Sequence, residues 1–307
     1  MSAAIPPFTR VDNAPRGILM MLIAVFLFSV LNVLVKITAA DYPLTQVTFF
    51  RNAFALIPVA AMVMAQGGMA SVRTQRPLGH LGRACIGLVS MTLMFWSFHL
   101  LPMADAQALN FAAPLFLTAL SVPFLGEKVG IHRWSAVAVG FIGVLVMVRP
   151  GADVLQLGAL VALGAALSQS LAMIFIRQLS RSESANTIVF YFTLIGTVLS
   201  ALTLPFAWRT PGLWDLGLLI LAGLIGGMAQ LFMTRAYSLA PASVIAPFTY
   251  AAIIWAVLFG WMLWGDVPGW HVTLGASVVV ASGCYILHRE TVRRRAALAA
   301  TAASADD

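Results

Sequence analysis

The fold is decided by two stretches of the chain, PMADAQALNFAAPLFLTALSVPFLGEKVGIH at 102–132 and PASVIAPFTYAAIIWAVLFGWMLWGDVPGWH at 241–271. Sliding the chain over itself by 139 positions lays the first stretch on the second without a gap, which is the pattern of an internal repeat. Matches of Leu and Ala arise by chance in an apolar chain, but an ordered set of proline, glycine with acid, glycine and histidine does not. The matched pairs are Pro102 and Pro241, Gly126-Glu127 and Gly265-Asp266, Gly130 and Gly269, and His132 and His271.

The composition around this repeat is that of a membrane protein. Of the 307 residues, 61% are hydrophobic and 9% are charged, whereas a soluble domain carries about 25% charged residues. A transmembrane helix needs roughly 20 apolar residues, and ten runs of about that length are separated by the charged segments. We therefore predict an all-α membrane protein with ten transmembrane helices, at approximately 17–38, 44–65, 79–101, 104–125, 133–149, 155–176, 186–207, 213–236, 241–264 and 270–288.

The repeat contains five helices, and this odd number sets the orientation of its second copy. The second copy must enter the membrane from the opposite side, so we predict two inverted five-helix repeats related by a pseudo-two-fold axis in the membrane plane. Such an architecture supplies two similar conformations, one open to each side. The predicted organisation is a cytoplasmic tail at 1–16, a first repeat at 17–151, a second repeat at 152–288 and a basic, Ala-rich cytoplasmic tail at 289–307.

The net charge of +7 indicates membrane topology. With a cytoplasmic N-terminus, cytoplasmic ends and loops hold 14 of the 18 cations, and the opposite side or the spans hold Lys36, Arg51, Arg149 and Arg209. The positive-inside rule then predicts a multi-pass membrane protein with both termini in the cytoplasm, and the family resemblance described next implies the bacterial inner membrane. The expected partners are the lipid bilayer and a small-molecule solute, with no nucleic acid, and the sequence leaves a homodimer open.

The motifs of both stretches resemble a known family, the EamA domain of the drug/metabolite transporter superfamily. The resemblance covers about 17–288. It implies a permease whose solute cavity lies between the two halves, with the fifth helix of each half at the periphery. It does not identify the solute, because similar proteins handle amino acids, S-adenosylmethionine, riboflavin and other metabolites. The residues that carry it are Pro102, Leu125-Gly126-Glu127-Lys128, Arg133-Trp134, Gly140, Gly143, Arg149-Pro150-Gly151, Pro241, Pro247 and Gly265-Asp266, the last being Glu in many relatives.

Polar side chains inside the spans mark the expected solute cavity. A polar group in hydrocarbon is costly unless it faces the bundle interior or water. For a single Ser or Thr, a helix-to-helix hydrogen bond is the better explanation, whereas for the amides the two explanations are equally good. Amides offer both donors and acceptors, and aromatic rings can stack on a planar or cationic solute. The candidate solute-binding residues are Asn32, Arg51, Asn52, Trp96, Gln107, Asn110, Gln169, Tyr191, Gln230, Tyr250 and Trp255.

Two cations fall inside the predicted spans. Arg51 lies about 10 Å along its helix at 1.5 Å per residue, where it either snorkels or faces the cavity and suits a carboxylate or phosphate. Lys36 lies nearer the membrane boundary, and we expect it to snorkel. All 11 acidic residues fall in tails, loops or span ends, so no mid-membrane carboxylate is available to titrate. The coupling is therefore left open, with proton coupling through Asp105 or His99 as one alternative.

Small residues and prolines predict how the helices meet. Gly223 and Gly227 form a GxxxG pattern, which favours close helix packing. Pro58, Pro114 and Pro247 lie inside spans and predict local bends that relative movement of the two halves can use.

The sequence argues against other classes of function. It has no G-x-S-x-G or H-E-x-x-H motif and no acidic pair inside the membrane, so we expect no catalytic residues, metal or cofactor. Cys85 and Cys284 are expected to be buried packing thiols. We predict a secondary transporter of a small organic metabolite that works by alternating access. The alternatives are an S-adenosylmethionine or riboflavin uptake carrier, an amino-acid or metabolite exporter, and more remotely an intramembrane enzyme or a channel. The first is suggested because Phe49-Phe50-Arg51, followed by Arg76-Pro77, His80 and Arg83, resembles the S-adenosylmethionine carriers.

Overall fold

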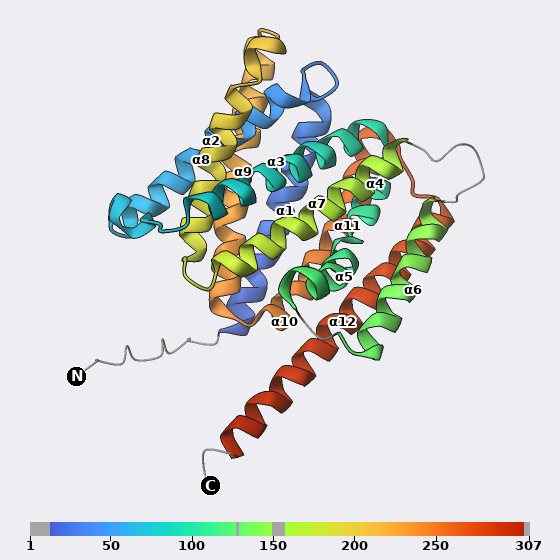
Figure 1. Ribbon diagram of the computed structural model, residues 1–307. Coiled ribbons are helices and arrows are strands. Elements are labelled where there is room, and N and C mark those ends of the chain that lie inside the picture. The colour runs from blue at the N-terminus through green and yellow to red at the C-terminus, as the bar shows by residue number, and fades with distance from the viewer. Residues whose placement is uncertain (1–12, 127–128, 149–156, 304–307) are drawn as a thin grey trace.

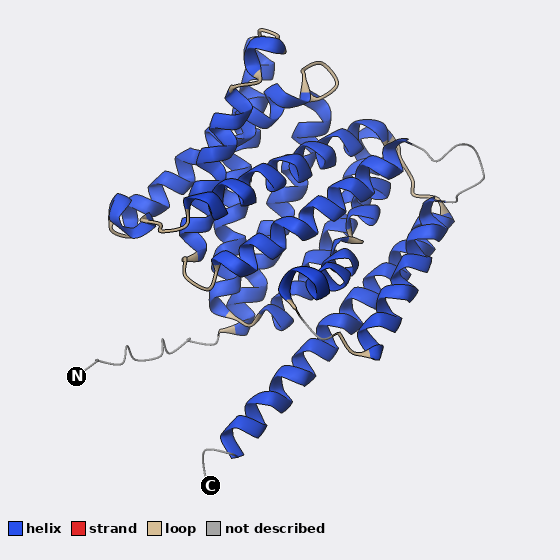
Figure 2. Cartoon of the chain, in the orientation of Figure 1, coloured by secondary structure: helices blue, strands red, loops and turns tan. Residues whose placement is uncertain are grey.

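The computed structural model describes residues 13–126, 129–148 and 157–303, and within these ranges the chain is helical without a strand (Figure 2). These ranges contain ten helical spans long and apolar enough to cross a membrane, which confirms the predicted all-α membrane fold. The helices are α1 (Ala14–Thr38), α2 (Leu44–Ala65), η1 (Gly68–Val72), α3 (Pro77–Leu100), α4 (Met103–Asn110), α5 (Ala113–Leu125), α6 (Ile131–Val148), α7 (Leu157–Leu179), α8 (Ala185–Ala201), η2 (Leu204–Phe206), α9 (Leu213–Leu239), α10 (Ala242–Ile245), η3 (Ala246–Ala251), α11 (Ala252–Trp264) and α12 (Trp270–Ala303) (Figure 1).

The fourth and ninth spans are broken helices. The fourth is interrupted between α4 and α5, and the ninth changes from α10 through the 3₁₀ helix η3 to α11. Pro114 and Pro247 lie at these interruptions, where a residue without an N–H cannot continue the ladder of helical hydrogen bonds. The 139-position shift lays α5 on α11 from first residue to last, so the repeat extends to the position of the break.

Both broken spans begin and end in the same way. The carbonyls of Pro102 and Pro241 each accept the first helical hydrogen bonds, at 3.1 Å from Ala106 N and 3.2 Å from Ile245 N. Gly126 and Gly265 close α5 and α11 in the left-handed conformation, with φ of 66° and 70°. This conformation suits glycine because it has no Cβ. The structural roles predicted for these prolines and glycines therefore have a local physical basis. Glu127 and the 149–156 segment lie outside the described residues.

Replacing Gly265 with Ala is expected to lower the free energy of unfolding by about 1 kcal/mol, since a Cβ is unfavourable in the left-handed region. The melting temperature of the purified protein in detergent measures this change. Gly217→Ala is the matched control, because Gly217 lies in α9 with nothing within 4 Å of an added Cβ. This control is expected to be neutral or stabilising. Equal destabilisation by the two variants would contradict the capping role.

The packing of the spans follows the symmetry expected of an inverted repeat. The first helix of each half lies against the third helix of the other half, as α1 against α9 and α7 against α3. The second helices, α2 and α8, contact each other, and so do the fifth helices, α6 and α12 (Figure 1). Exchanging every span with its counterpart five spans along leaves this pattern unchanged. The two halves are therefore interlocked and not merely joined end to end.

The contact between α6 and α12 is symmetric at the level of single residues. Ser282 donates a hydrogen bond to the Ala136 carbonyl, and a Cβ on Gly143 would lie 2.8 Å from the Gly275 carbonyl oxygen. The 139-position shift carries Ala136 to Gly275 and Gly143 to Ser282, so each contact is the counterpart of the other. Residues further along α6 contact residues that lie earlier in α12, so these two helices are antiparallel. This arrangement fits two inverted repeats and places their fifth helices together at the periphery.

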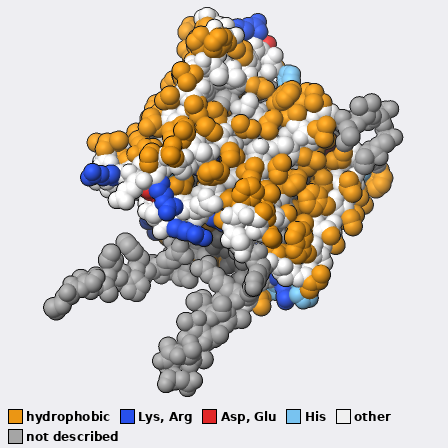
Figure 3. All heavy atoms as spheres, in the orientation of Figure 1, with side chains coloured by type: hydrophobic (Ala, Val, Ile, Leu, Met, Phe, Trp, Pro, Cys, Tyr) orange, Lys and Arg blue, Asp and Glu red, His pale blue; other side chains and the backbone are white. Residues whose placement is uncertain are grey.

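The surface supports membrane insertion. On the face shown in Figure 3, hydrophobic side chains dominate, and Lys and Arg gather toward its margins. Exposed tryptophans lie near helix ends, as expected for an aromatic belt at a membrane interface. They include Trp134 at the start of α6, and Trp208, Trp214 and Trp270 at the other end of the bundle. We call that other end, where α1 ends and α2 begins, the Asp266 face, and we call the opposite end the Glu183 face.

Candidate functional site

Helices α2 and α9 pack closely together, and this contact places Arg51 of α2 inside the bundle. A Cβ on Gly223 would lie 2.5 Å from Phe54 Cβ and 2.7 Å from the Phe50 carbonyl oxygen. A Cβ on Gly227 would lie 2.9 Å from the Ala55 carbonyl oxygen. The predicted close packing of this GxxxG pattern is confirmed, and α2 carries Arg51 into the same contact region.

Arg51 is buried at 6% exposure, so it does not snorkel to the membrane surface. Its Nη1 donates to Asn52 Oδ1 at 3.0 Å, and Asn52 Nδ2 donates to the Thr48 carbonyl at 3.0 Å. Its Nε has no hydrogen-bond partner and lies 3.3 Å from the position that a Cβ on Gly226 would occupy. Arg51 and Asn52 are the two sequence candidates that the structure joins directly.

Arg83 is a second cation in this region that the candidate set omitted. It lies inside the third span, and its side chain follows α3 toward Gly87. Its guanidinium carbon lies 4.3 Å from the centroid of the Phe192 ring on α8, within the range of a cation–π contact. The charge distribution along the sequence assigns Arg83 to the cytoplasmic cations, although this residue falls within the apolar run predicted at 79–101. Its position in that run was the signal that could have identified it.

Gln169 and Tyr191 contact other polar residues of α3. Ser90 donates to Gln169 Oε1 at 3.2 Å, which links α3 to α7. The Tyr191 ring lies 4.6 Å from the His80 ring, which links α3 to α8. Both candidates therefore lie where helices from different halves meet.

Tyr250 packs at the breaks of the fourth and ninth spans. Its ring meets Phe111 edge to face at 4.9 Å, and the repeat shift of 139 makes these two residues counterparts. The Tyr250 hydroxyl occupies the space beside Gly283 of α12. Gln107, at 7% exposure, and Asn110 lie on α4 just before the break. Tyr250 is thus an internal packing residue between the two halves.

The remaining candidates are spread over other contacts. Trp255 lies 4.9 Å from Phe26 of α1, and Trp96 is 36% exposed on α3. Asn32 and Gln230 are half-buried on α1 and α9. Among the residues that the structure describes, Arg51 and Asn52 are the one candidate pair joined by a hydrogen bond or ring contact.

Lys36 forms a contact between the two halves at the Asp266 face. Its Nζ lies 3.6 Å from Asp266 Oδ2 and donates to the Leu101 carbonyl at 3.2 Å. It also lies 4.8 Å from the centroid of the Trp264 ring. Asp105 Oδ1, in the first turn of α4 at the same face, is buried without a hydrogen-bond partner. The expected snorkelling of Lys36 is therefore wrong, because the ammonium is held inside the bundle by Asp266 and Trp264 of the opposite half and by the Leu101 carbonyl of its own half.

A second contact between the halves lies on the same face. Tyr42 donates to Asp215 Oδ2 at 2.7 Å, and this hydrogen bond raises the pKa of the Tyr42 hydroxyl above its usual value. Gln46 and Arg209 exchange two hydrogen bonds, at 2.8 Å and 2.9 Å. These contacts tie the segment between the first two helices of one half to the third helix of the other half.

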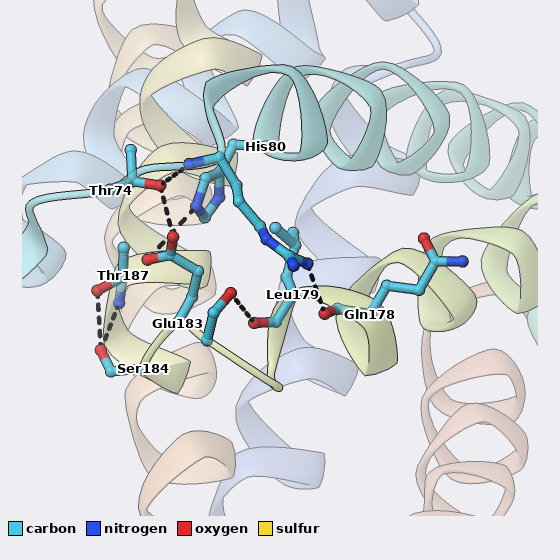
Figure 4. Close-up of polar contacts among 9 residues, drawn as sticks. Thr74, His80, Gln178, Leu179, Glu183, Ser184 and Thr187 are labelled. Atoms are coloured by element: carbon cyan, nitrogen blue, oxygen red, sulfur yellow. Dashed lines mark hydrogen bonds and ion pairs between the residues drawn. The ribbon is translucent and has the colours of Figure 1, made fainter.

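The equivalent contact of the repeat occurs at the Glu183 face (Figure 4). Thr74 donates to Glu183 Oε1 at 2.7 Å, and His80 Nε2 lies 4.0 Å from Glu183 Oε2. Arg76 donates to the Gln178 carbonyl at 3.3 Å. Here the segment between α7 and α8, the first two helices of the second half, meets the start of α3, the third helix of the first half. The contact at the Asp266 face joins the equivalent segments with the two halves exchanged. Each face of the bundle therefore carries a polar contact between repeat-equivalent segments.

A cavity of about 350 Å³ beside this cluster contains none of the candidate residues; it is lined by residues 75–79 at and before the start of α3 and by Phe175, Gln178 and Leu179 of α7. We therefore do not assign the solute site to it. Among the described residues, no group of three His, Cys, Asp or Glu could hold a metal ion. Both cysteines were expected to be buried, but Cys284 is only half-buried and Cys85 is exposed on α3, so the prediction is wrong for Cys85.

Comparison with known proteins agrees with these features. The model of the EamA-like transporter family matches residues 15–149 and 156–288. A solved crystal structure superposes with a TM-score of 0.62 at 20% identity, covering 91% of this chain and 98% of that one. At this identity the superposition shows a common fold alone.

Three curated relatives carry the names of transporters. The chain is 32% identical to a riboflavin transporter of Vibrio cholerae, over 91% of this chain and 95% of that protein. It is 31% identical to the pseudopaline exporter CntI of Pseudomonas aeruginosa, over 91% and 98%. It is 27% identical to an S-adenosylmethionine uptake transporter of Rickettsia conorii, over 80% and 83%.

Proposed function

The chain belongs to the EamA-like transporter family, and from that premise we propose that it is a secondary carrier that moves a small organic metabolite by alternating access. The names of its relatives indicate transporters rather than enzymes. The ten spans make it a multi-pass membrane protein. We place it in the bacterial inner membrane with both termini in the cytoplasm, so that the Glu183 face is cytoplasmic.

The observation that carries this proposal is the matched pair of contacts between the halves. Tyr42 and Asp215 join them at one face, and Glu183 with Thr74 joins them at the other, through segments that correspond in the repeat. At each face the contact is a hydroxyl that donates to a carboxylate at 2.7 Å, so opening either face releases the same kind of contact. A bundle with two such contacts can open at one face while it stays closed at the other, which is the requirement of alternating access.

The family does not identify the solute. One relative is named as an uptake transporter and another as an exporter, so the names of similar proteins include both directions of transport. A third is named for riboflavin. Uptake of a cofactor and export of a metabolite therefore both remain candidate roles. We propose that the solute lies between the halves at 17–151 and 152–288. The residues that we propose to line its path are Asn32, Arg51, Asn52, Trp96, Gln107, Asn110, Gln169, Tyr191, Gln230, Tyr250 and Trp255.

Exchange of labelled solute across proteoliposomes tests the carrier mechanism. Candidate solutes are first found by a thermal-shift screen, in which a ligand at 100 times its Kd stabilises the protein by about 2.7 kcal/mol. A carrier is expected to show saturable uptake that is accelerated by unlabelled solute on the opposite side, because the loaded protein returns faster than the empty one. A flux that does not saturate and shows no acceleration would identify a channel instead and contradict the proposal.

A further inference from the structure

Two guanidinium groups approach each other inside the bundle from opposite membrane faces. Arg51 lies seven residues into α2, which starts at the Asp266 face, and Arg83 lies six residues into α3, which starts at the Glu183 face. At 1.5 Å per residue these positions are about 10 Å inside their respective faces. The Arg83 side chain then continues toward Gly87, away from its nearer face. Both groups therefore point toward the middle of the bundle.

Neither of these two cations has a counter-ion in the part of the chain that the structure describes. Among the described residues no carboxylate lies within 4 Å of either guanidinium. Both groups also approach neighbouring turns of α8, because Asn52, which accepts from Arg51, lies beside Gly196, and Arg83 lies over the ring of Phe192 one turn away. A buried charge without a partner is expensive, and in membrane spans such charges face a solute pathway or pair with another group. The protein alone leaves this positive charge uncompensated.

Both arginines, and a threonine next to one of them, have unused hydrogen-bond donors. Arg51 Nε, Arg83 Nε and Arg83 Nη1 are buried without hydrogen-bond partners. Thr48, one turn before Arg51 on α2, also has a buried hydroxyl without a partner. Arginine N–H groups form a planar fork that matches the oxygens of a carboxylate or a phosphate. The arrangement thus offers donors to an anion and offers no complementary set to a cation.

Glycines on the neighbouring helix surfaces accommodate the two guanidiniums. Gly226 faces Arg51, and Gly87 faces Arg83, so neither position adds a side chain there. Phe192 supplies a ring face to Arg83. A shift of 141 positions, which lays Phe49-Phe50 on Phe190-Tyr191, lays Arg51 on Phe192. The cationic groups therefore come from the first repeat, and the second repeat supplies an aromatic wall at the equivalent place.

We propose that Arg51 and Arg83 jointly bind an anionic group of the transported solute, a carboxylate or a phosphate, with Thr48 as a further donor. This inference rests on the proposed carrier function and narrows its solute to molecules that carry such a group. The bound anion supplies the counter-charge that the protein lacks. The loaded bundle is therefore more stable than the empty one.

Thermal-shift measurements on the purified full-length protein test this assignment with paired probes. The anionic probes are inorganic phosphate, succinate and AMP, and the uncharged partners are succinamide and adenosine, all at equal ionic strength. At least one anionic probe is expected to raise the Tm, by on the order of 5 °C at 100 times its Kd. The uncharged partners are expected to leave the Tm unchanged.

Variants separate a binding role from a structural one. Arg51→Gln and Arg83→Gln are each expected to weaken the binding of the anion on the order of 10- to 100-fold. They are also expected to leave the Tm of the empty protein equal or higher, because an uncompensated buried charge is removed. Arg51→Lys keeps the charge but not the fork, and it is expected to recover part of the affinity. Arg235→Gln is the matched control, since Arg235 is exposed near the end of α9.

The inference is overturned if no anionic probe raises the Tm, if the uncharged partners raise it equally, or if Arg51→Gln responds to the anion as the unmodified protein does. Solute exchange in proteoliposomes distinguishes this failure from failure of the carrier proposal. Exchange of an uncharged solute that is unaffected by Arg51→Gln would sink the anion site and leave the carrier intact. Anion binding without any solute exchange would sink the carrier mechanism and leave the anion site intact.

Discussion

Gly223→Leu is expected to separate α2 from α9 and to destabilise the protein by about 3 kcal/mol or more, with loss of transport. The Cβ alone would lie 2.5 Å from Phe54 Cβ and 2.7 Å from the Phe50 carbonyl oxygen. Backbone atoms cannot turn aside as a flexible side chain can, so the two helices must move apart. Overpacking of this kind costs about 1–3 kcal/mol for added methylenes and more when the backbone is displaced. Because α2 carries Arg51, the movement also displaces the proposed anion site.

Melting temperature and size-exclusion profile in detergent measure the destabilisation, and solute exchange measures the loss of transport. Gly217→Leu supplies the matched control on the same helix, where an added Cβ meets nothing within 4 Å. The control is expected to retain both stability and transport, because leucine is a better helix former than glycine. A Gly223→Leu protein as stable and active as this control would show that α2 and α9 do not need their close contact.

Lys36→Glu is expected to open the Asp266 face and to reduce transport by about tenfold or more. A tenfold reduction corresponds to a contact that contributes about 1.4 kcal/mol to closing this face. The substitution replaces the cation that holds Asp266 at 3.6 Å with another acidic group on the face that also carries Asp105. Like charges at this spacing repel, and the half-buried setting limits screening by salt. The hydrogen bond to the Leu101 carbonyl is lost as well.

Reaction with a membrane-impermeant maleimide at Gln107→Cys, in a background lacking Cys85 and Cys284, reports the opening. Faster labelling from the Asp266 face is expected in the Lys36→Glu protein. Combining Lys36→Glu with Asp266→Lys restores an opposite pair and is expected to recover slow labelling and part of the transport. Asp41→Asn, an exposed substitution on the same face, serves as the control. Unchanged labelling in Lys36→Glu, or no recovery in the charge swap, would contradict a closing role for this pair.

The broken spans show how far local pattern predicted the fold. The two matched stretches contained Pro102, Pro241, Gly126 and Gly265, and each of the described positions has the backbone role that its residue type allows. Helix length and hydropathy predicted the ten spans because every backbone polar group in hydrocarbon must be satisfied within its own helix. The interruption between α4 and α5 was indicated only indirectly by Pro114, since proline in a span is compatible with either a bend or a break.

The candidate site was harder to predict because sequence position does not report direction. Arg51 was found by its depth in a span, yet the same depth left snorkelling open until its burial was known. Arg83 was overlooked, because a cation near a span end is usually an anchor and only the course of its side chain toward Gly87 distinguishes it. Lys36 was expected to snorkel, but its partner Asp266 lies 230 positions later in the chain, in the opposite half.

The sequence by itself determined the membrane class, the number of spans and the five-helix repeat, because hydropathy and repeat spacing are properties of the linear order of residues. It also determined where the broken spans begin and end, at Pro102, Gly126, Pro241 and Gly265, because the backbone chemistry of these single residues is sufficient to start or end a helix. Only the tertiary structure decided that Arg51 and Arg83 approach neighbouring turns of α8, and that Lys36 meets Asp266. Those pairs depend on how interlocked helices are rotated and packed, and close packing at residues such as Gly223 and Gly226 sets that rotation in three dimensions.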